Sequence, residues 1–163
     1  MLHDLSAAGA VFGLEIGGTL HGVAAWVPPE APNSSRRSVL PARFASFEVR
    51  ALFPRAAPQL LGGFDTLGQS HPEEPHWYLA FVGIEPDRQR RGLGRILLAP
   101  IIARADQAGV ACYLETPFPD TRSFYRRLGF EDTDELRPVT DAPTIWTMTR
   151  APSAPASPVA GHS

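Results

Sequence analysis

Apolar and polar positions change period several times along the chain, and these changes divide it into strands and helices. Residues 77–84, WYLAFVGI, are almost all apolar, which is typical of a strand buried on both faces. After Gly92 apolar residues recur every three or four positions up to residue 105, which predicts a helix. Residues 110–115, VACYLE, predict a second buried strand. This part of the chain therefore predicts a β–α–β unit with two parallel strands and a right-handed crossover.

The segments on either side of this unit carry the remaining predicted elements. Two β-like runs flank the Gly-Gly pair at 17–18 and predict a hairpin, which the Pro-Pro pair at 28–29 ends. Apolar positions between 42 and 69 recur at three and four, which predicts two short helices broken by prolines. Towards the end of the chain we expect a short helix at residues 123–128 and strands in FEDTDEL and TIWTMTR.

Together these elements predict the α/β class, with a mixed α+β sheet and helices on both of its faces. We expect one domain over residues 1–150, because the chain of 163 residues suits a single domain. A chain of this size buries roughly 70% of its surface on folding, which is enough for a core. Residues 151–163 are rich in Pro, Ala and Ser and predict a disordered tail.

Charge and residue usage exclude several kinds of chemistry. The formal net charge is −2, and all 15 basic residues are arginines, which excludes a Schiff-base lysine and a P-loop lysine. A single cysteine, Cys112, excludes a disulfide framework within the chain and a Cys-rich metal site, and we predict no bound metal. The first 18 residues lack the pattern of a secretory signal, and no stretch of about 18 apolar residues exists. We therefore expect a cytoplasmic protein without nucleic-acid or membrane partners.

A basic, glycine-containing turn, RQRRGLGR at residues 88–95, joins the first buried strand to the helix. Backbone N–H groups at a helix N-terminus lack acceptors, glycines admit a bulky anion, and arginines add forked donors, so this turn is a candidate phosphate site. A solvated connection is the alternative that the turn alone leaves open. A dinucleotide fingerprint is excluded because Leu97 stands where its third glycine is needed. A nucleic-acid patch would need basic residues over a whole face.

The stretch VGIEPDRQRRGLGRILL resembles the acetyl-CoA-binding motif of the GNAT N-acetyltransferases, whose signature Gln/Arg-x-x-Gly-x-Gly/Ala falls on Gln89, Gly92 and Gly94. A later segment, YLETPFPDTRSFYRRLGFE, resembles the family region that ends in Phe-Tyr-x-x-x-Gly-Phe. EPHWYLAFVGIEPDRQRRGLG, AGVACYLET, FYRRLGF and IWTMTR are most similar to the puromycin N-acetyltransferase-like branch, in order and spacing. The resemblance covers residues 74–150, about half the chain.

This resemblance implies a GNAT-type acyl-CoA N-acyltransferase fold, in which two central parallel strands splay apart and hold the pantetheine arm of acetyl-CoA. Gly83 falls where a β-bulge would help to produce the splay, with a close backbone approach as the alternative. Backbone groups of Val82 and Ile84 would pair with the arm, and one N–H would face the thioester oxygen. Phe118 stands where the family often has an Asn that contacts pantetheine. The residues implied for acetyl-CoA are Val82, Gly83, Ile84, Gln89, Arg90, Arg91, Gly92, Leu93, Gly94, Arg95 and Phe118.

Candidate catalytic residues follow from the same resemblance. Tyr125 matches the tyrosine that protonates the departing CoA thiolate, with packing of its helix onto the sheet as the alternative role. Glu115 is the first candidate for the base that takes the amine proton, with pairing to an arginine as the alternative, and Glu85 is the second. His21 and Trp26 are candidates for the acceptor site, with a surface or cross-strand role and a core role as the alternatives.

The resemblance thus implies an enzyme that moves an acetyl group from acetyl-CoA to a primary amine of a small molecule, such as an antibiotic-like amine, by direct attack in a ternary complex. A protein N-terminus is left open as another acceptor. In the segment HPEEPH, prolines and loop context predict that His71 and His76 hold no metal. The chain begins close to the predicted hairpin, so we expect a start that is short for the family and an exposed sheet edge, which leaves a homodimer open. The alternatives are a non-catalytic acyl-CoA-binding or regulatory module, and a truncated, decayed acetyltransferase.

Overall fold

A computed structural model describes residues 1–4, 10–31, 71–137 and 144–153 of the chain. The helices predicted between 42 and 69 and most of the predicted tail lie outside these residues. The described strands are β1 (Leu2–Asp4), β2 (Val11–Ile16), β3 (Thr19–Val27), β4 (His76–Ile84), β5 (Ala111–Thr116), β6 (Glu131–Leu136) and β7 (Ile145–Arg150). The described helices are the 3₁₀ turn η1 (Pro86–Arg88), α4 (Leu93–Ala108) and α5 (Pro119–Arg126).

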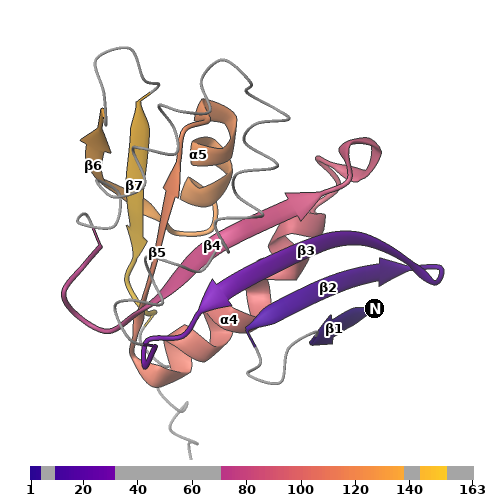
Figure 1. Cartoon of the computed structure of the whole chain (residues 1–163), viewed down its shortest axis with the longest axis horizontal. Helices are drawn as coiled ribbons and strands as arrows, with labels where there is room; N and C mark the ends of the chain where they lie inside the picture. Colours follow the sequence, from indigo (N-terminus) through magenta and orange to yellow (C-terminus); the bar gives the residue numbers. More distant parts are fainter. Residues whose placement is uncertain (5–9, 32–70, 138–143, 154–163) are drawn as a thin grey trace, which may run out of the picture.

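The described strands form one seven-stranded sheet with the order β1-β2-β3-β4-β5-β7-β6. Neighbouring strands are antiparallel throughout, except that β4 and β5 at the centre are parallel. Their pairing is limited to His76↔Ala111, Trp77↔Cys112 and Tyr78↔Tyr113, and beyond these pairs the two strands diverge (Figure 1). We call the diverging parts, residues 79–84 of β4 and 114–116 of β5, the splay. The predicted mixed sheet with a splayed parallel pair is confirmed.

The irregularity of β4 lies at Ala80, and the prediction of a bulge at Gly83 was wrong. Ala25 of β3 pairs with Phe81 but Trp26 pairs with Leu79, so one extra residue, Ala80, is inserted into β4. The insertion moves Phe81 to the face away from the core, where its ring is exposed. Gly83 has a different role, because a Cβ at this position would lie 3.0 Å from the Phe81 ring.

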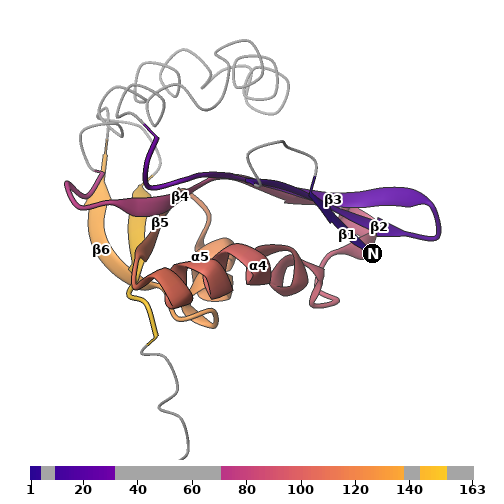
Figure 2. The ribbon, with the colours of Figure 1, turned by 90° about the horizontal axis from the view of Figure 1, so that it is seen from below.

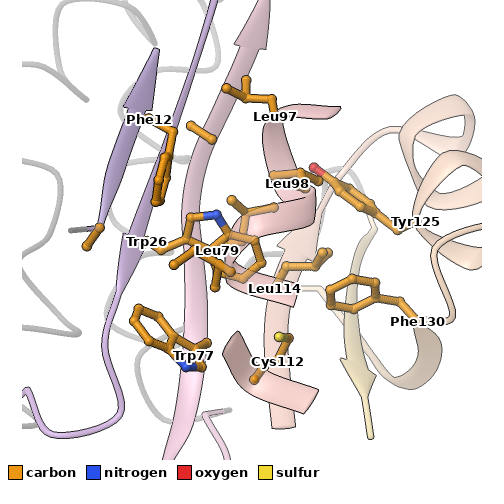
Figure 3. Close-up of a cluster of buried hydrophobic side chains, with 14 of the residues drawn as sticks. Phe12, Trp26, Trp77, Leu79, Leu97, Leu98, Cys112, Leu114, Tyr125 and Phe130 are labelled. Carbon is orange, nitrogen blue, oxygen red and sulfur yellow. The ribbon is translucent and has the colours of Figure 1, made fainter. Parts of the chain in front are cut away.

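Both α4 and α5 cover the same face of the sheet (Figure 2). α4 packs on β2, β3, β4 and β5, so it spans the junction between the two antiparallel halves. The core lies between this helical layer and the sheet, as Figure 3 shows for its largest side chains. No helix of the described ranges is long and apolar enough to cross a membrane.

Local sequence signals explain where these elements begin and end. Gly17 and Gly18 form the β2–β3 turn with φ of 61° and 82°, the left-handed values that a two-residue hairpin needs. Gly109, with φ of 66°, ends α4, and the helix runs through Pro100 without a break. α5 begins at Pro119, four residues before the predicted start, because a proline suits the first helical position.

Candidate active site

The central strand pair, β4 and β5, has two chemically different faces. Trp77 and Leu79 of β4 and Leu114 of β5 point into the core beneath α4. Because side chains alternate along a strand, Tyr78 and Glu115 point to the opposite face. Any molecule held between the diverging strands would therefore meet the helical layer on one face and this polar group on the other.

The turn between η1 and α4 has the backbone of an anion site. Gly92 is the N-cap of α4 with φ of 79°, and Arg90 also has a positive φ, 57°. The amides of Leu93 and Gly94 belong to the first helical turn, where no intrahelical acceptor exists. A Cβ at Gly92 would have nothing within 4 Å, so the space over the helix end is open. The turn thus combines donors, access and nearby guanidinium groups.

Side-chain contacts attach this turn to the sheet. Gln89 donates from Nε2 to the carbonyl oxygen of Ile84 at 2.9 Å. Glu85 donates its backbone N–H to the His21 carbonyl oxygen at 3.0 Å, and its Oε2 lies 2.5 Å from Nδ1 of the buried His21. These contacts therefore fix the position of the turn relative to the end of β4. The Glu85 carboxylate is already paired with His21.

The second glycine of the motif lets α5 approach the start of α4. A Cβ at Gly94 would lie 3.0 Å from Cζ of Phe124, which is a closer approach than such contacts normally allow. Phe124 and Tyr125 are neighbours on α5, with ring centroids 5.2 Å apart. Gly94 therefore helps to set the position of Tyr125 by allowing close helix packing.

Tyr125 is buried on the helical face of the splay. Its ring contacts that of Phe130 edge to face at a centroid distance of 5.8 Å, and it belongs to the core with Leu97, Leu98 and Leu114. Figure 3 shows the ring directed from α5 towards α4, with its hydroxyl end on the side of Leu98. Burial raises the pKa of Tyr125, so the phenol stays protonated at neutral pH and can act as a proton donor.

A cluster of charged residues holds α5 against the β6–β7 pair. Arg122 donates from Nε to Asp132 Oδ1 at 2.5 Å, and Arg126 also pairs with Asp132. The Arg122 guanidinium lies 4.7 Å from the centre of the Trp146 ring, within cation–π range. These contacts fix the face that α5 presents to the splay.

Glu115 lies on the opposite face, and only 8% of its side chain is exposed. Burial raises its pKa to about 7, although hydrogen bonding to Tyr78 and Tyr113 acts in the other direction. Its Oε1 makes no hydrogen bond to any described residue, while Nε2 of His71 lies 3.3 Å away in an unaligned contact. A buried carboxylate that titrates near neutrality is suited to general-base chemistry.

Three comparisons place this geometry among known proteins. The sequence model of the acetyltransferase (GNAT) family matches residues 6–130, most of the chain. The chain belongs to this family. An uncharacterized N-acetyltransferase of Schizosaccharomyces pombe is 36% identical over 58 residues, which is 36% of this chain and 24% of that protein. The chain therefore matches about a quarter of the length of this curated relative.

Solved structures of GNAT proteins share the fold. The histone acetyltransferase HPA2 and related acetyltransferase of Corynebacterium glutamicum is 26% identical, with a TM-score of 0.59 over 90% of this chain and 66% of that one. A polyamine N-acetyltransferase of Drosophila melanogaster, which forms N-acetylagmatine, has a TM-score of 0.59 at 15% identity, over 88% of this chain and 75% of that one. The second likeness concerns the fold alone.

Within the GNAT frame, the structure brings together some predicted site residues and not others. Val82 and Ile84 lie on the splay, residues 89–92 form the turn beside it, and residues 93–95 begin α4. Trp26 is buried in the core on the helical side, as Figure 3 shows, which argues for its core role and against contact with an acceptor. Phe118 is exposed at the start of α5, where its backbone caps the helix.

Sequence reasoning missed the surroundings of Glu115 in this GNAT chain. The segment HPEEPH was interpreted as a loop, but His76 opens β4 and is fully buried, and His71 lies beside it. No group of metal-binding side chains gathers within the described ranges. Alternation along β4 would have placed His76 and Tyr78 on one face, but the approach of His71 depends on a turn that periodicity does not encode.

Proposed function

We propose that the chain catalyses transfer of an acetyl group from acetyl-CoA to a primary amine of a small molecule, by direct attack in a ternary complex. One observation carries the proposal: the proton acceptor Glu115 and the proton donor Tyr125 lie on opposite faces of the same splay. Direct transfer needs this division, because the amine loses a proton on one side while the departing sulfur gains one on the other. An acyltransferase of the GNAT family also fits the family match.

The residues around the splay fit acetyl-CoA, which supplies the acetyl group as a thioester. The amides and guanidinium groups of residues 90–95 would hold its pyrophosphate at the N-terminus of α4. Val82 and Ile84 would pair with the pantetheine arm through backbone groups, with one N–H positioned for the thioester oxygen. Gly92 leaves the approach to the helix end open. Positioning by these groups would provide much of the rate enhancement.

Two side chains would move the protons. Glu115 would take a proton from the acceptor ammonium, directly or through a water molecule, so that the amine nitrogen can attack the acetyl carbon. Tyr125 would give its hydroxyl proton to the sulfur as the C–S bond breaks. The neutral state of Tyr125 and the near-neutral pKa of Glu115 suit these opposite roles.

A small cationic amine is the acceptor class that we favour. The buried carboxylate of Glu115 suits an ammonium group, and the structurally similar Drosophila enzyme forms N-acetylagmatine. The resemblance to the puromycin branch points to an amino-nucleoside as a second small amine. A protein amine is the alternative, since the Corynebacterium relative is described as a histone acetyltransferase. A homodimer and a cytoplasmic location remain predictions from the sequence.

A non-catalytic acyl-CoA-binding module is the second candidate function. The exposed Phe118 favours it, because an apolar ring stands where the family often has a polar contact to pantetheine. Both candidates bind acetyl-CoA, but only the enzyme releases free thiol when an amine is added. A thiol-release screen with agmatine, spermidine, puromycin and a peptide carrying a free N-terminus therefore separates the functions and the acceptor classes.

Calorimetric titration with acetyl-CoA tests the cofactor site first. Gly92→Glu should weaken binding at least tenfold, because it places a carboxylate in the space over the α4 amides. Gly109→Glu is the matched control: Gly109 caps the other end of the same helix, also with a positive φ and nothing within 4 Å of a Cβ. Equal weakening by both variants, or no binding of the unmodified chain at millimolar acetyl-CoA, would contradict the proposed cofactor site.

A further inference from the structure

A continuous line of side-chain contacts runs from a backbone carbonyl to Glu115. Nδ1 of His76 lies 2.8 Å from the carbonyl oxygen of Glu74. Nε2 of His76 lies 3.3 Å from Nδ1 of His71, and Nε2 of His71 lies 3.3 Å from Oε1 of Glu115. Each histidine therefore uses both of its ring nitrogens in the line.

The chemistry of the first contact determines the tautomers of the others. A carbonyl oxygen only accepts, so Nδ1 of His76 must carry a proton. A neutral His76 then has a bare Nε2, which accepts from Nδ1–H of His71. A neutral His71 in turn has a bare Nε2 beside Glu115, so two acceptor atoms lie 3.3 Å apart with no hydrogen bond between them when the carboxylate is ionised.

One additional proton relieves this arrangement. It can sit on Oε1 of Glu115 or on Nε2 of His71, and in either place a small rotation of the ring or the carboxylate lets one atom donate and the other accept. The same proton can also shift along the line to His76, because each imidazole accepts on one nitrogen as it donates from the other. The carboxylate and the two rings therefore form a unit that binds a proton together, as coupled groups do.

The surroundings of this unit are aromatic. The His71 ring lies between those of Tyr78 and Tyr113, at centroid distances of 4.5 Å and 4.8 Å. Tyr78 comes from β4 and Tyr113 from β5, and burial raises the pKa of both, so they remain neutral. Asp134 of β6 acts on Tyr113 through its charge, and Thr147 of β7 hydrogen-bonds to Tyr113. Neither of these two groups supplies a positive charge to Glu115.

We propose that His71 and His76 are positioning residues that make Glu115 the proton acceptor of the reaction, with the accepted proton shared between Oε1 of Glu115 and Nε2 of His71. This inference rests on the proposed function and deepens its base step. An N–H bond of the acceptor ammonium breaks, its electron pair stays on the nitrogen, and the proton bonds to the Glu115–His71 pair. His76 acts one step further away, by keeping a bare Nε2 directed at His71.

Nitrogen NMR of the free protein tests the arrangement without any acceptor. The five histidines of the chain are labelled with ¹⁵N on their rings, and His71→Gln and His76→Gln variants assign the two signals. Above the pKa of the pair, both rings should carry their proton on Nδ1. In Glu115→Gln, the apparent pKa of His71 should fall by about one unit or more, because an anionic neighbour is lost. A proton on Nε2 of either neutral ring, or an unchanged His71 pKa in Glu115→Gln, would overturn the proposal.

The pH profile of kcat/KM, measured with the amine that the thiol-release screen selects, tests the catalytic role. His71→Gln gives Glu115 a permanent N–H donor, which stabilises the carboxylate, so the acidic limb should move about one pH unit lower and the maximum should fall. His76→Leu should shift the limb in the same direction, since His71 can then carry its proton on Nε2. His76→Gln keeps one acceptor and one donor and should restore the profile.

Glu131→Gln, which removes an exposed carboxylate on β6, is the matched control and should leave the limb in place. If the acidic limb of the kcat/KM profile lay at the same pH in all variants, His71 and His76 would have a purely structural role and the proposal would be overturned. The failure of the proposed function is distinguishable, because it would give the expected NMR tautomers and coupling together with no acetyl transfer to any amine.

Discussion

At the scale of single residues, the candidate site keeps a carboxylate where little of it is exposed to solvent. Glu115 is buried beside two neutral phenols and an imidazole, and this environment disfavours its charged form. Such a position lowers the stability of the folded chain whenever the carboxylate is ionised, and it is retained where a proton must be exchanged near neutral pH. The loss of folding stability and the proposed role as proton acceptor therefore have the same physical origin, the burial of the carboxylate.

Removal of the Glu115 charge should stabilise the chain in a pH-dependent way. The folded-state pKa of about 7 lies above the ordinary value of 4.5, so stability falls as the pH rises through 7. Urea unfolding should show that Glu115→Gln increases the free energy of unfolding more at pH 8 than at pH 6, by about 1 kcal/mol. Glu131→Gln, which removes an exposed carboxylate, should change the free energy of unfolding by the same small amount at both pH values. A gain from Glu115→Gln that does not depend on pH would show that its charge is not disfavoured by folding.

At the scale of elements, periodicity was sufficient for the β4–turn–α4–β5 unit, because each of its elements is long and strongly apolar. Periodicity failed where one inserted residue or one turn decides which way a side chain points. The bulge lies at Ala80 because Phe81 changes face there, a choice made by packing across β3 and β4 that apolar spacing does not record. His71 was missed for a similar reason, since its contact with Glu115 joins a loop to a strand far away in the sequence.

The end of α4 is tied to β7 by a partly buried ion pair that the sequence did not indicate. Arg150 donates from both terminal nitrogens to the two oxygens of Asp106, at 2.7 Å and 3.0 Å, and Ser153 donates its backbone N–H to the same carboxylate. Since Arg150 is buried, loss of its partner leaves a buried charge uncompensated. This pair holds the helix whose other end carries the turn proposed to bind phosphate.

Asp106→Asn should therefore lower the free energy of unfolding at pH 7 by about 3 kcal/mol, measured with urea. The hydrogen bond from Arg150 holds the pKa of Asp106 below its ordinary value of 3.8, so the stabilising contribution is present at neutral pH and is lost in acid. The difference between the two proteins should narrow as the pH falls below 3.8. Asp87→Asn, which changes an exposed carboxylate in η1, is the control and should have little effect. If Asp106→Asn lowered the free energy of unfolding by less than about 1 kcal/mol, packing alone would fix the end of α4.

At the scale of the whole molecule, the sheet consists of two antiparallel halves that share only three parallel residue pairs. β1 to β4 form one half, and β5, β7 and β6 form the other. The splay leaves backbone groups of both halves without strand partners on their facing sides, and α4 spans the junction. A ligand that pairs with both strand edges would complete the sheet and join its halves. The fold therefore predicts that binding acts on the junction as well as on the turn.

Hydrogen exchange followed by mass spectrometry should detect this completion of the sheet. Alternate amides in residues 79–84 and 114–116 face the splay, and we expect saturating acetyl-CoA to slow their exchange together with that of residues 90–95. ADP, which has a pyrophosphate but no pantetheine arm, should protect only residues 90–95. Gly92→Glu should abolish both effects at the same acetyl-CoA concentration. If acetyl-CoA protected the turn and left the splay unchanged, the pantetheine arm would have to bind elsewhere, and Glu115 and Tyr125 would no longer lie on either side of the reacting bond.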